Sequence, residues 1–160
     1  MELKRPYLGL CLGHQLLADA LGGKCDKLDP PEIGVLDIEL TDAGLADPIF
    51  RDMPKHQRAL QWHSVQVTQT PDNCTVLAHS PACANQAMRV GDNAWSMQYH
   101  VEVEPDTVDN WAAIPTYRSA LVNTLGEQAL TGLRKDAASE LESFAANSEL
   151  LYRNFVASLK

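Results

Sequence analysis

The chain has 160 residues, of which 45% are hydrophobic and 21% charged, and its formal net charge is -8. This length and composition are typical of one compact globular domain with a sizeable core, and they exclude a disordered chain. The negative charge and the lack of a basic run argue against a nucleic-acid-binding surface, because binding to phosphates depends on clustered lysine and arginine. We therefore predict one domain over residues 1–160 and no nucleic-acid partner.

The N-terminus and the cysteines indicate the compartment. Residues 1–5 and the apolar run after them could suggest a signal peptide, but polar residues interrupt that run at His14, Gln15 and Asp19, and no stretch could span a bilayer. The four cysteines lack the spacing of a disulfide framework: Cys11, Cys25, Cys74 and Cys83. We predict a cytoplasmic protein that does not associate with membranes.

A strand, a turn and a helix are predicted at the start of the chain. Residues 6–10 form a short apolar run that is typical of a buried strand. From Leu12 to Leu21 the apolar residues recur at helical spacing, and Gly22 and Gly23 are a helix stop signal.

Cys11 stands at this turn between Gly9 and Gly13, as in a nucleophile elbow with cysteine in place of serine. The glycines allow strand and helix to approach closely while the nucleophile occupies a strained turn. The helix N-terminus favours a thiolate, and the amide of Leu12 is placed to bind an oxyanion. A buried structural cysteine is the alternative, and the elbow alone does not decide between the two.

The middle of the chain is predicted to be rich in strands, in this order: 24–28, 32–41, 74–80, 85–90 and 94–100. Pro30 and Pro31 predict a break between the first two strands. Residues 47–54 predict a helical turn bounded by prolines.

The last third of the chain is predicted to be helical. Asp106 can cap a first helix that Pro115 ends. Two more helices are expected over residues 117–125 and 127–155, with an interruption of the second near Asn147. Charged residues of the last helix are expected to form a solvated face.

His100 and Glu102 follow the strand predicted at 94–100. Side chains in an extended segment alternate, so an imidazole and a carboxylate two residues apart point to the same face. A carboxylate so placed can orient the histidine and stabilise its imidazolium. Glu104 has the same parity, and a solvated His–Glu pair at a strand end is the alternative. Together with Cys11, the pair completes a set of nucleophile, base and orienting acid.

Residues 9–15 (Gly-Leu-Cys-Leu-Gly-His-Gln) and 98–102 (Gln-Tyr-His-Val-Glu) together resemble class I glutamine amidotransferases, particularly stand-alone proteins similar to the amidotransferase domain of GMP synthase. The family's catalytic residues fall on Cys11, His100 and Glu102. Many members have proline where this chain has Val101, which leaves the parity of the pair unchanged. The resemblance implies an α/β fold, a flavodoxin-like mostly parallel sheet with helices on both faces, an antiparallel extension around residues 74–100 and a helical C-terminus.

Residues 59–65 resemble the family segment, following a strand, that grips the amino and carboxylate ends of bound glutamine. By that resemblance the substrate-binding candidates are Gln15, Trp62, Ser64 and Val65. Alternatively, Trp62 and His63 are a packed aromatic and a satisfied histidine near a turn. His63 could compete with His100 as the base, but it lacks a carboxylate two residues on.

The resemblance implies glutamine hydrolysis. The Cys11 thiolate attacks the side-chain amide carbon and His100 protonates the departing ammonia. Glu102 orients His100, and water then releases glutamate from the thioester. The family passes its ammonia to an acceptor, and no synthetase domain follows Lys160, so we expect a separate ammonia-accepting enzyme.

Two other functions remain open. A γ-glutamyl peptidase would use the same three residues on a γ-glutamyl compound, and a non-catalytic binding or assembly module would keep them by descent. We expect no cofactor. Cys74, His79 and Cys83 match no familiar zinc spacing, so no metal site is predicted.

Complete domains of the family carry further elements before the elbow strand, including a first strand and a glycine-containing loop that supplies a second oxyanion N–H. Here the elbow cysteine is residue 11. A missing neighbour exposes a sheet edge, and one lost oxyanion donor costs about a hundred- to a thousandfold in turnover. We therefore predict a fragment, a truncated reading frame, or a chain that pairs with a partner or with itself through this edge. Full activity is not expected from these 160 residues alone.

Overall fold

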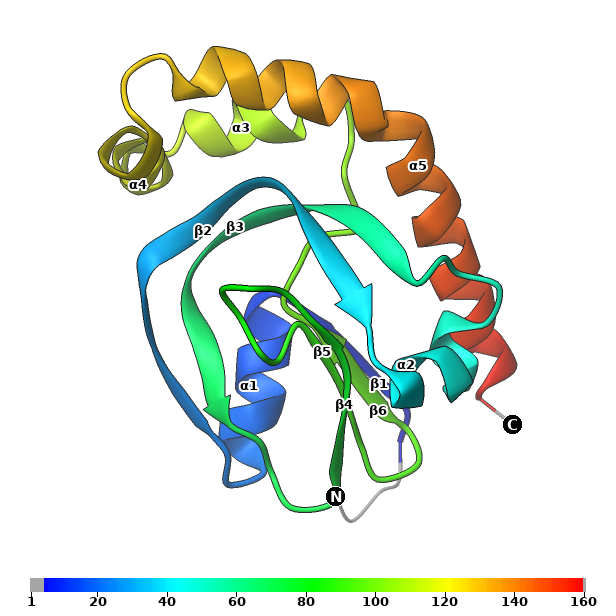
Figure 1. Ribbon diagram of the computed structural model, residues 1–160. Coiled ribbons are helices and arrows are strands. Elements are labelled where there is room, and N and C mark those ends of the chain that lie inside the picture. Colours follow the sequence, from blue (N-terminus) through cyan, green and yellow to red (C-terminus); the bar gives the residue numbers. More distant parts are fainter. Residues whose placement is uncertain (1–4, 160) are drawn as a thin grey trace.

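The computed structural model describes residues 5–159, whose strands form one curled sheet (Figure 1). Residues 1–4, the start of the rejected signal-peptide candidate, lie outside this range. Within it, no helix is long and apolar enough to cross a membrane. The elements in chain order are β1 (Tyr7–Leu10), α1 (Leu12–Ala20), β2 (Lys24–Leu40), α2 (Asp42–Ala46), the short 3-10 helix η1 (Pro48–Phe50), β3 (His56–Gln69), β4 (Cys74–His79), β5 (Ala87–Val90), β6 (Ala94–Met97), α3 (Thr107–Ala112), α4 (Pro115–Leu125) and α5 (Ala129–Ala157).

The described strands are ordered β1-β6-β5-β4-β2-β3 in the sheet. Strands β1 and β6 pair in parallel, whereas β2–β3, β2–β4, β4–β5 and β5–β6 pair antiparallel. The predicted α/β class is confirmed, but the described sheet is mixed rather than mostly parallel. Short turns such as the one between β5 and β6 permit only antiparallel pairing, because a parallel pair needs a long crossover.

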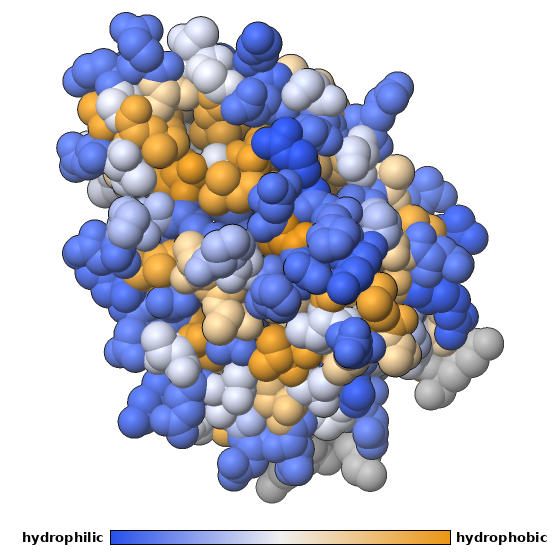
Figure 2. Space-filling model, viewed as in Figure 1, coloured by the Kyte–Doolittle hydropathy of each residue, from blue (hydrophilic) through white to orange (hydrophobic). Residues whose placement is uncertain are grey.

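Helices cover both faces of the sheet, as predicted. Successive residues of β6 point to opposite faces. Ala94 belongs to a hydrophobic cluster with Leu17 of α1, whereas Trp95 belongs to a cluster with Leu151 of α5. A third cluster joins Trp62 of β3 to α3, α4 and α5. Figure 2 shows apolar side chains gathered at the upper left of the molecule, in the region of α3 and α4.

Strands β2 and β3 are long, curved and paired over most of their length, and they form the wall of a half-barrel (Figure 1). The predicted break at Pro30 and Pro31 is wrong, since β2 runs through both residues. The register with β3 instead shifts between Lys27 and Glu32. Prolines, which cannot donate to a ladder, are tolerated at such an irregularity.

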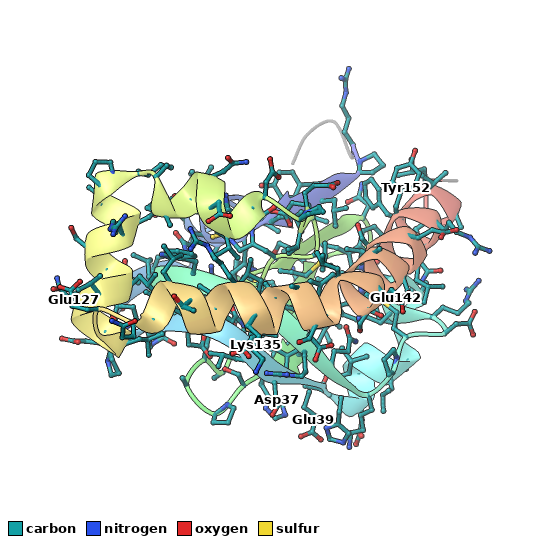
Figure 3. The ribbon with its side chains drawn as sticks, turned by 90° about the horizontal axis from the view of Figure 1, so that it is seen from above. Asp37, Glu39, Glu127, Lys135, Glu142 and Tyr152 are labelled. Atoms are coloured by element: carbon teal, nitrogen blue, oxygen red, sulfur yellow. The ribbon has the colours of Figure 1, made fainter. Side chains whose placement is uncertain are left out.

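The three C-terminal helices form an arch over the sheet (Figure 1). Pro115 is the first residue of α4 rather than the end of the helix before it, and its missing N–H costs nothing there. Helix α5 is unbroken at Asn147, which is buried, so the predicted interruption is also wrong. Lys135 and Glu142 lie on its exposed face, as expected (Figure 3).

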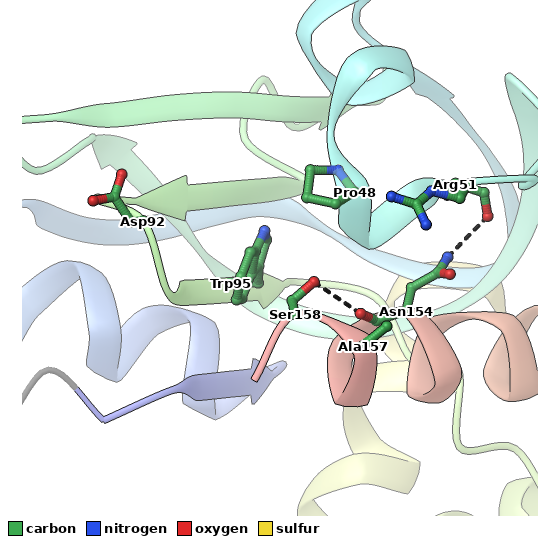
Figure 4. A pocket seen from close by; sticks show the side chains of 7 residues that line it. All are labelled: Pro48, Arg51, Asp92, Trp95, Asn154, Ala157 and Ser158. Atoms are coloured by element: carbon green, nitrogen blue, oxygen red, sulfur yellow. Dashed lines mark hydrogen bonds between the residues drawn. The ribbon is translucent and has the colours of Figure 1, made fainter. Parts of the chain in front are cut away.

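The end of α5 is attached to η1 beside a cavity of about 450 Å3 (Figure 4). Asn154 Nδ2 donates to the carbonyl oxygens of Ile49 at 3.0 Å and Arg51 at 2.8 Å. Trp95 lines this cavity and makes an edge-to-face contact with Phe155, with ring centroids 6.1 Å apart. These contacts hold the long helix against the sheet.

Strand β1 is an edge of the described sheet, since β6 is its only partner among residues 5–159. Leu12 and Leu16 of the neighbouring helix α1 are 63% and 55% exposed. The strand that leads into Cys11 is therefore held by one ladder within the described chain.

Candidate active site

The backbone at Cys11 has the strained conformation expected of an elbow. Its φ of 45° and ψ of -100° are unusual for a residue with a side chain. The Cys11 N–H donates to the carbonyl of Met97 at 2.8 Å, and the Cys11 carbonyl accepts from His14 N at 3.0 Å. The turn is thereby tied both to β6 and to the first turn of α1.

Gly9 permits the close approach of strand and helix that this turn requires. A Cβ at Gly9 would lie 2.7 Å from the backbone carbon of Gly13 and 2.6 Å from Tyr7 Cε1, which is closer than real contacts allow. The Tyr7 hydroxyl donates to the Gly13 carbonyl at 2.8 Å and fixes the same approach. The sequence predicts that Gly9 and Gly13 allow strand and helix to approach closely, and this is confirmed at Gly9.

His100 lies beyond the end of β6, because the strand stops at Met97 rather than at residue 100. The backbone N–H of His100 donates to the Leu60 carbonyl of β3 at 3.0 Å, which fixes its position. His100 Nδ1 is 2.6 Å from Glu102 Oε1, and Glu102 Oε2 accepts from Val101 N at 2.9 Å. The predicted contact between the two side chains is therefore present, although the segment is not a regular strand.

The His100 imidazole lines the same pocket as the Cys11 side chain. Burial would lower the pKa of His100, but its interactions with Cys11 and Glu102 outweigh this effect and raise the pKa to about 9. Burial would raise the pKa of Glu102, but its contact with His100 lowers it overall. The arrangement favours a protonated His100 imidazole beside an ionised Glu102 carboxylate.

Cys11 and His100 line one pocket of about 270 Å3, together with Leu10, Leu12, Trp62, Trp111 and Tyr117. The ring centroid of Trp111 is 4.5 Å from that of His100 and 5.8 Å from that of Trp62. Tyr117 is 6.1 Å from Trp62 by the same measure. The sequence pointed to neither Trp111 nor Tyr117 as a site residue, because helical apolar spacing is the only pattern around them.

The other substrate-binding candidates lie in different places. Trp62 lines the pocket, and its segment is part of β3 itself rather than a loop after a strand. Gln15 and Val65 contact each other, since Gln15 Nε2 donates to the Val65 carbonyl at 3.2 Å. Ser64 is exposed and is not among the residues that line this pocket. Leu12 is the first residue of α1, so its N–H is one of the amides without a partner in the helix.

His63, the rival base, is paired inside the half-barrel instead. His63 Nε2 is 3.0 Å from Glu32 Oε2, and the two side chains are 2% and 5% exposed. The register of β2 and β3 places these residues directly opposite each other. Local spacing could not have identified Glu32, because the pairing joins residues 31 positions apart. Among the described residues, no group of three potential ligands could hold a metal ion.

Comparisons with known proteins identify the family of the chain. The family model for glutamine amidotransferase class-I matches residues 1–111. A GMP synthase (glutamine-hydrolyzing) subunit of Pyrococcus abyssi is 36% identical over 103 residues, which are 64% of this chain and 53% of that protein. The GMP synthase of Lacticaseibacillus rhamnosus is 40% identical over 104 residues, 64% of this chain and 20% of that protein.

Solved structures show the same fold. A glutamine amidotransferase from Thermotoga maritima superposes with a TM-score of 0.80 at 28% identity, covering 94% of this chain and 62% of that one. A glutamine amido transferase from Methylobacillus flagellatus gives a TM-score of 0.82 at 23% identity. The chain spans about half the length of the separate GMP synthase subunits that it matches. The matched residues 1–111 contain the elbow and the His–Glu pair, and the chain belongs to the class I glutamine amidotransferase family.

Proposed function

We propose that the chain hydrolyses the side-chain amide of glutamine with Cys11 as the nucleophile. The observation that carries this proposal is the lining of one pocket by both Cys11 and His100, with Glu102 Oε1 2.6 Å from His100 Nδ1. The pocket volume of about 270 Å3 lies just below the usual range for small-molecule sites, roughly 300–1,000 Å3. The pocket therefore suits a small substrate.

In this mechanism the Cys11 thiolate attacks the amide carbon, and the Leu12 N–H donates to the oxyanion. His100 gives its proton to the departing nitrogen, which leaves as ammonia. Water, deprotonated by His100, then breaks the thioester and releases glutamate. Glu102 holds the imidazole throughout.

Trp62 is proposed to bind the substrate. It lines the pocket beside Cys11 and His100, and its ring packs against those of Trp111 and Tyr117. Gln15, Ser64 and Val65 remain predictions from the family resemblance.

The ammonia is proposed to pass to a separate acceptor enzyme. The relatives from Pyrococcus abyssi and Sulfolobus acidocaldarius are each named as one subunit of a GMP synthase, and the chain covers little more than half of each. A second synthase subunit that binds this chain would provide such an acceptor.

Covalent labelling by the glutamine analogue 6-diazo-5-oxo-L-norleucine tests the proposal, because it needs only one attack by the thiolate. We expect mass spectrometry to find the label on Cys11, and glutamine to slow the labelling. Cys11→Ser should abolish it, whereas the matched change Cys74→Ser should not. A labelling rate that glutamine does not change would contradict the proposal. Faster hydrolysis of γ-glutamyl peptides than of glutamine would favour the peptidase.

A further inference from the structure

A continuous series of hydrogen bonds ends at the sulfur of Cys11. Gln98 Nε2 lies 3.6 Å from Cys11 Sγ, and the Gln98 residue is fully buried. Gln15 Nε2 lies 3.1 Å from Gln98 Oε1 and 3.2 Å from the carbonyl oxygen of Val65. The nucleophile is therefore in contact with a second polar group besides His100.

The backbone carbonyl of Val65 determines the direction of these hydrogen bonds. Amide groups of glutamine can be reversed, so their orientation follows from their partners. A carbonyl can only accept, so Gln15 must direct its NH2 group towards Val65 and Gln98. Gln98 must then direct its oxygen towards Gln15 and its NH2 group towards Cys11.

The Val65 carbonyl is itself held by a buried pair. His63 Nδ1 donates to it at 2.9 Å, and His63 Nε2 faces the Glu32 carboxylate at 3.0 Å. Glu32 accepts from Ser80 Oγ at 2.7 Å and from Gln86 Nε2 at 2.8 Å. Packed side chains of β2, β3 and the connection between β4 and β5 thus hold the carbonyl on which the orientation of Gln98 depends.

We propose that Gln98 is a further catalytic residue, whose side-chain N–H stabilises the Cys11 thiolate and holds its sulfur, and that Gln15 is a positioning residue for Gln98. A hydrogen bond from this N–H favours the ionised sulfur over the thiol, because a donor interacts more strongly with a charged acceptor. The inference rests on the proposed function, in which that thiolate is the nucleophile. In this inference the Gln15 amide nitrogen binds other residues of the protein, Val65 and Gln98. The family resemblance instead suggested that Gln15 binds the substrate.

The pH dependence of Cys11 alkylation by iodoacetamide tests this role without glutamine. Peptide mass spectrometry separates Cys11 from the other cysteines. We expect the midpoint of the pH–rate profile to rise by about one pH unit in Gln98→Leu, and further in Gln98→Glu, which places a carboxylate beside the sulfur. Gln61→Leu is the matched control, because Gln61 is equally buried and has no hydrogen-bond partner among the described residues.

A midpoint in folded Gln98→Leu equal to that of the unchanged chain would overturn the inference. If that variant does not fold, Gln15→Leu replaces it, and we expect a smaller rise of the same sign because the Gln98 amide is then free to reverse. No rise in folded Gln15→Leu would be equally negative. If the unchanged chain does not react with the glutamine analogue but Gln98→Leu still shifts the midpoint, the proposed function fails and Gln98 has no catalytic role, while its stabilisation of the Cys11 thiolate stands.

Discussion

Two histidine–glutamate pairs lie in different environments of this fold. The pocket pair, His100 and Glu102, has a Nδ1–Oε1 distance of 2.6 Å, and the Glu102 side chain is 47% exposed. The interior pair, His63 and Glu32, has a Nε2–Oε2 distance of 3.0 Å, and both side chains are almost completely buried. Residues two apart in the sequence form the first pair, whereas cross-strand pairing forms the second.

The comparison shows that a carboxylate beside a histidine does not by itself identify a catalytic base. His100 of the pocket pair lines a cavity together with Cys11. The interior pair contacts the backbone of β3 and the side chains of Ser80 and Gln86. A position on the pocket wall near Cys11 therefore distinguishes the first pair from the second, and the following predictions test whether that difference separates catalysis from stability.

The largest expected effect is that of His100→Asn on catalysis. Loss of the general acid and base should slow labelling by the glutamine analogue about a thousandfold, with little change in the melting temperature. The matched change His79→Asn, at an exposed histidine on β4, should alter neither quantity. Normal labelling of His100→Asn and loss of labelling in folded His63→Asn would reverse the assignment of the two pairs.

Removing one carboxylate should affect the two pairs in opposite ways. Glu32→Ala leaves buried groups without their partner, so we expect the free energy of unfolding in urea to fall by about 3–5 kcal/mol. Glu102→Ala removes a half-exposed carboxylate and should cost less than about 1 kcal/mol, while it slows labelling. Equal stabilities of the two variants would refute the distinction.

The interior and the pocket should also differ in their response to acid. Burial lowers the pKa of His14 to about 4 from its ordinary value of 6.5, and the positive charge of His63 adds to this effect. The unfolded chain therefore binds more protons than the folded chain between these pH values, so the free energy of unfolding falls as pH decreases from 6.5 to 4. This group contributes about 3 kcal/mol to that fall.

Urea unfolding at several pH values in this window measures the effect. Between pH 6.5 and 4, the free energy of unfolding of His14→Asn should fall by about 3 kcal/mol less than that of the unchanged chain. The asparagine side chain can still bond to the Ser96 hydroxyl, which His14 Nδ1 contacts at 2.9 Å. The same pH dependence in both proteins would show that His14 is not the group responsible.

The smallest expected effect concerns alkaline pH. The raised pKa of His100, about 9, keeps its proton through neutral pH, so labelling should decline only above that value. The stability that this imidazolium contributes is likewise complete below about pH 6.5 and lost as pH rises through 9. Glu102→Gln removes one cause of the raised pKa and should move the decline about one pH unit lower. Glu104→Gln is the matched control, and an equal movement there would implicate general surface charge.

The sequence predicts the local parts of this site well and its long-range parts poorly. The elbow at Cys11 and the contact of His100 with Glu102 depend on residues close together in the chain, where helical spacing and strand parity apply. The interior pair depends on how β2 and β3 are aligned, and this register shifts between Lys27 and Glu32. No local pattern specifies that register.

Tertiary contacts explain the remaining differences. Pro30 and Pro31 suggest a break, but pairing on both sides of them keeps β2 continuous. Asn147 is a weak helix former, yet its buried position in α5 outweighs that preference. The mixed direction of the strands follows from connection lengths rather than from the residues within each strand.

The aromatic wall of the pocket has an origin separate from that of the reacting groups. Trp111 comes from α3 and Tyr117 from α4, whereas Cys11 follows β1 and His100 follows β6. Under the proposed function, substitutions within residues 107–125 can therefore change these two aromatic contacts while Cys11 and His100 keep their positions. Trp62, the third aromatic residue of the pocket, belongs to β3 and is independent of that segment.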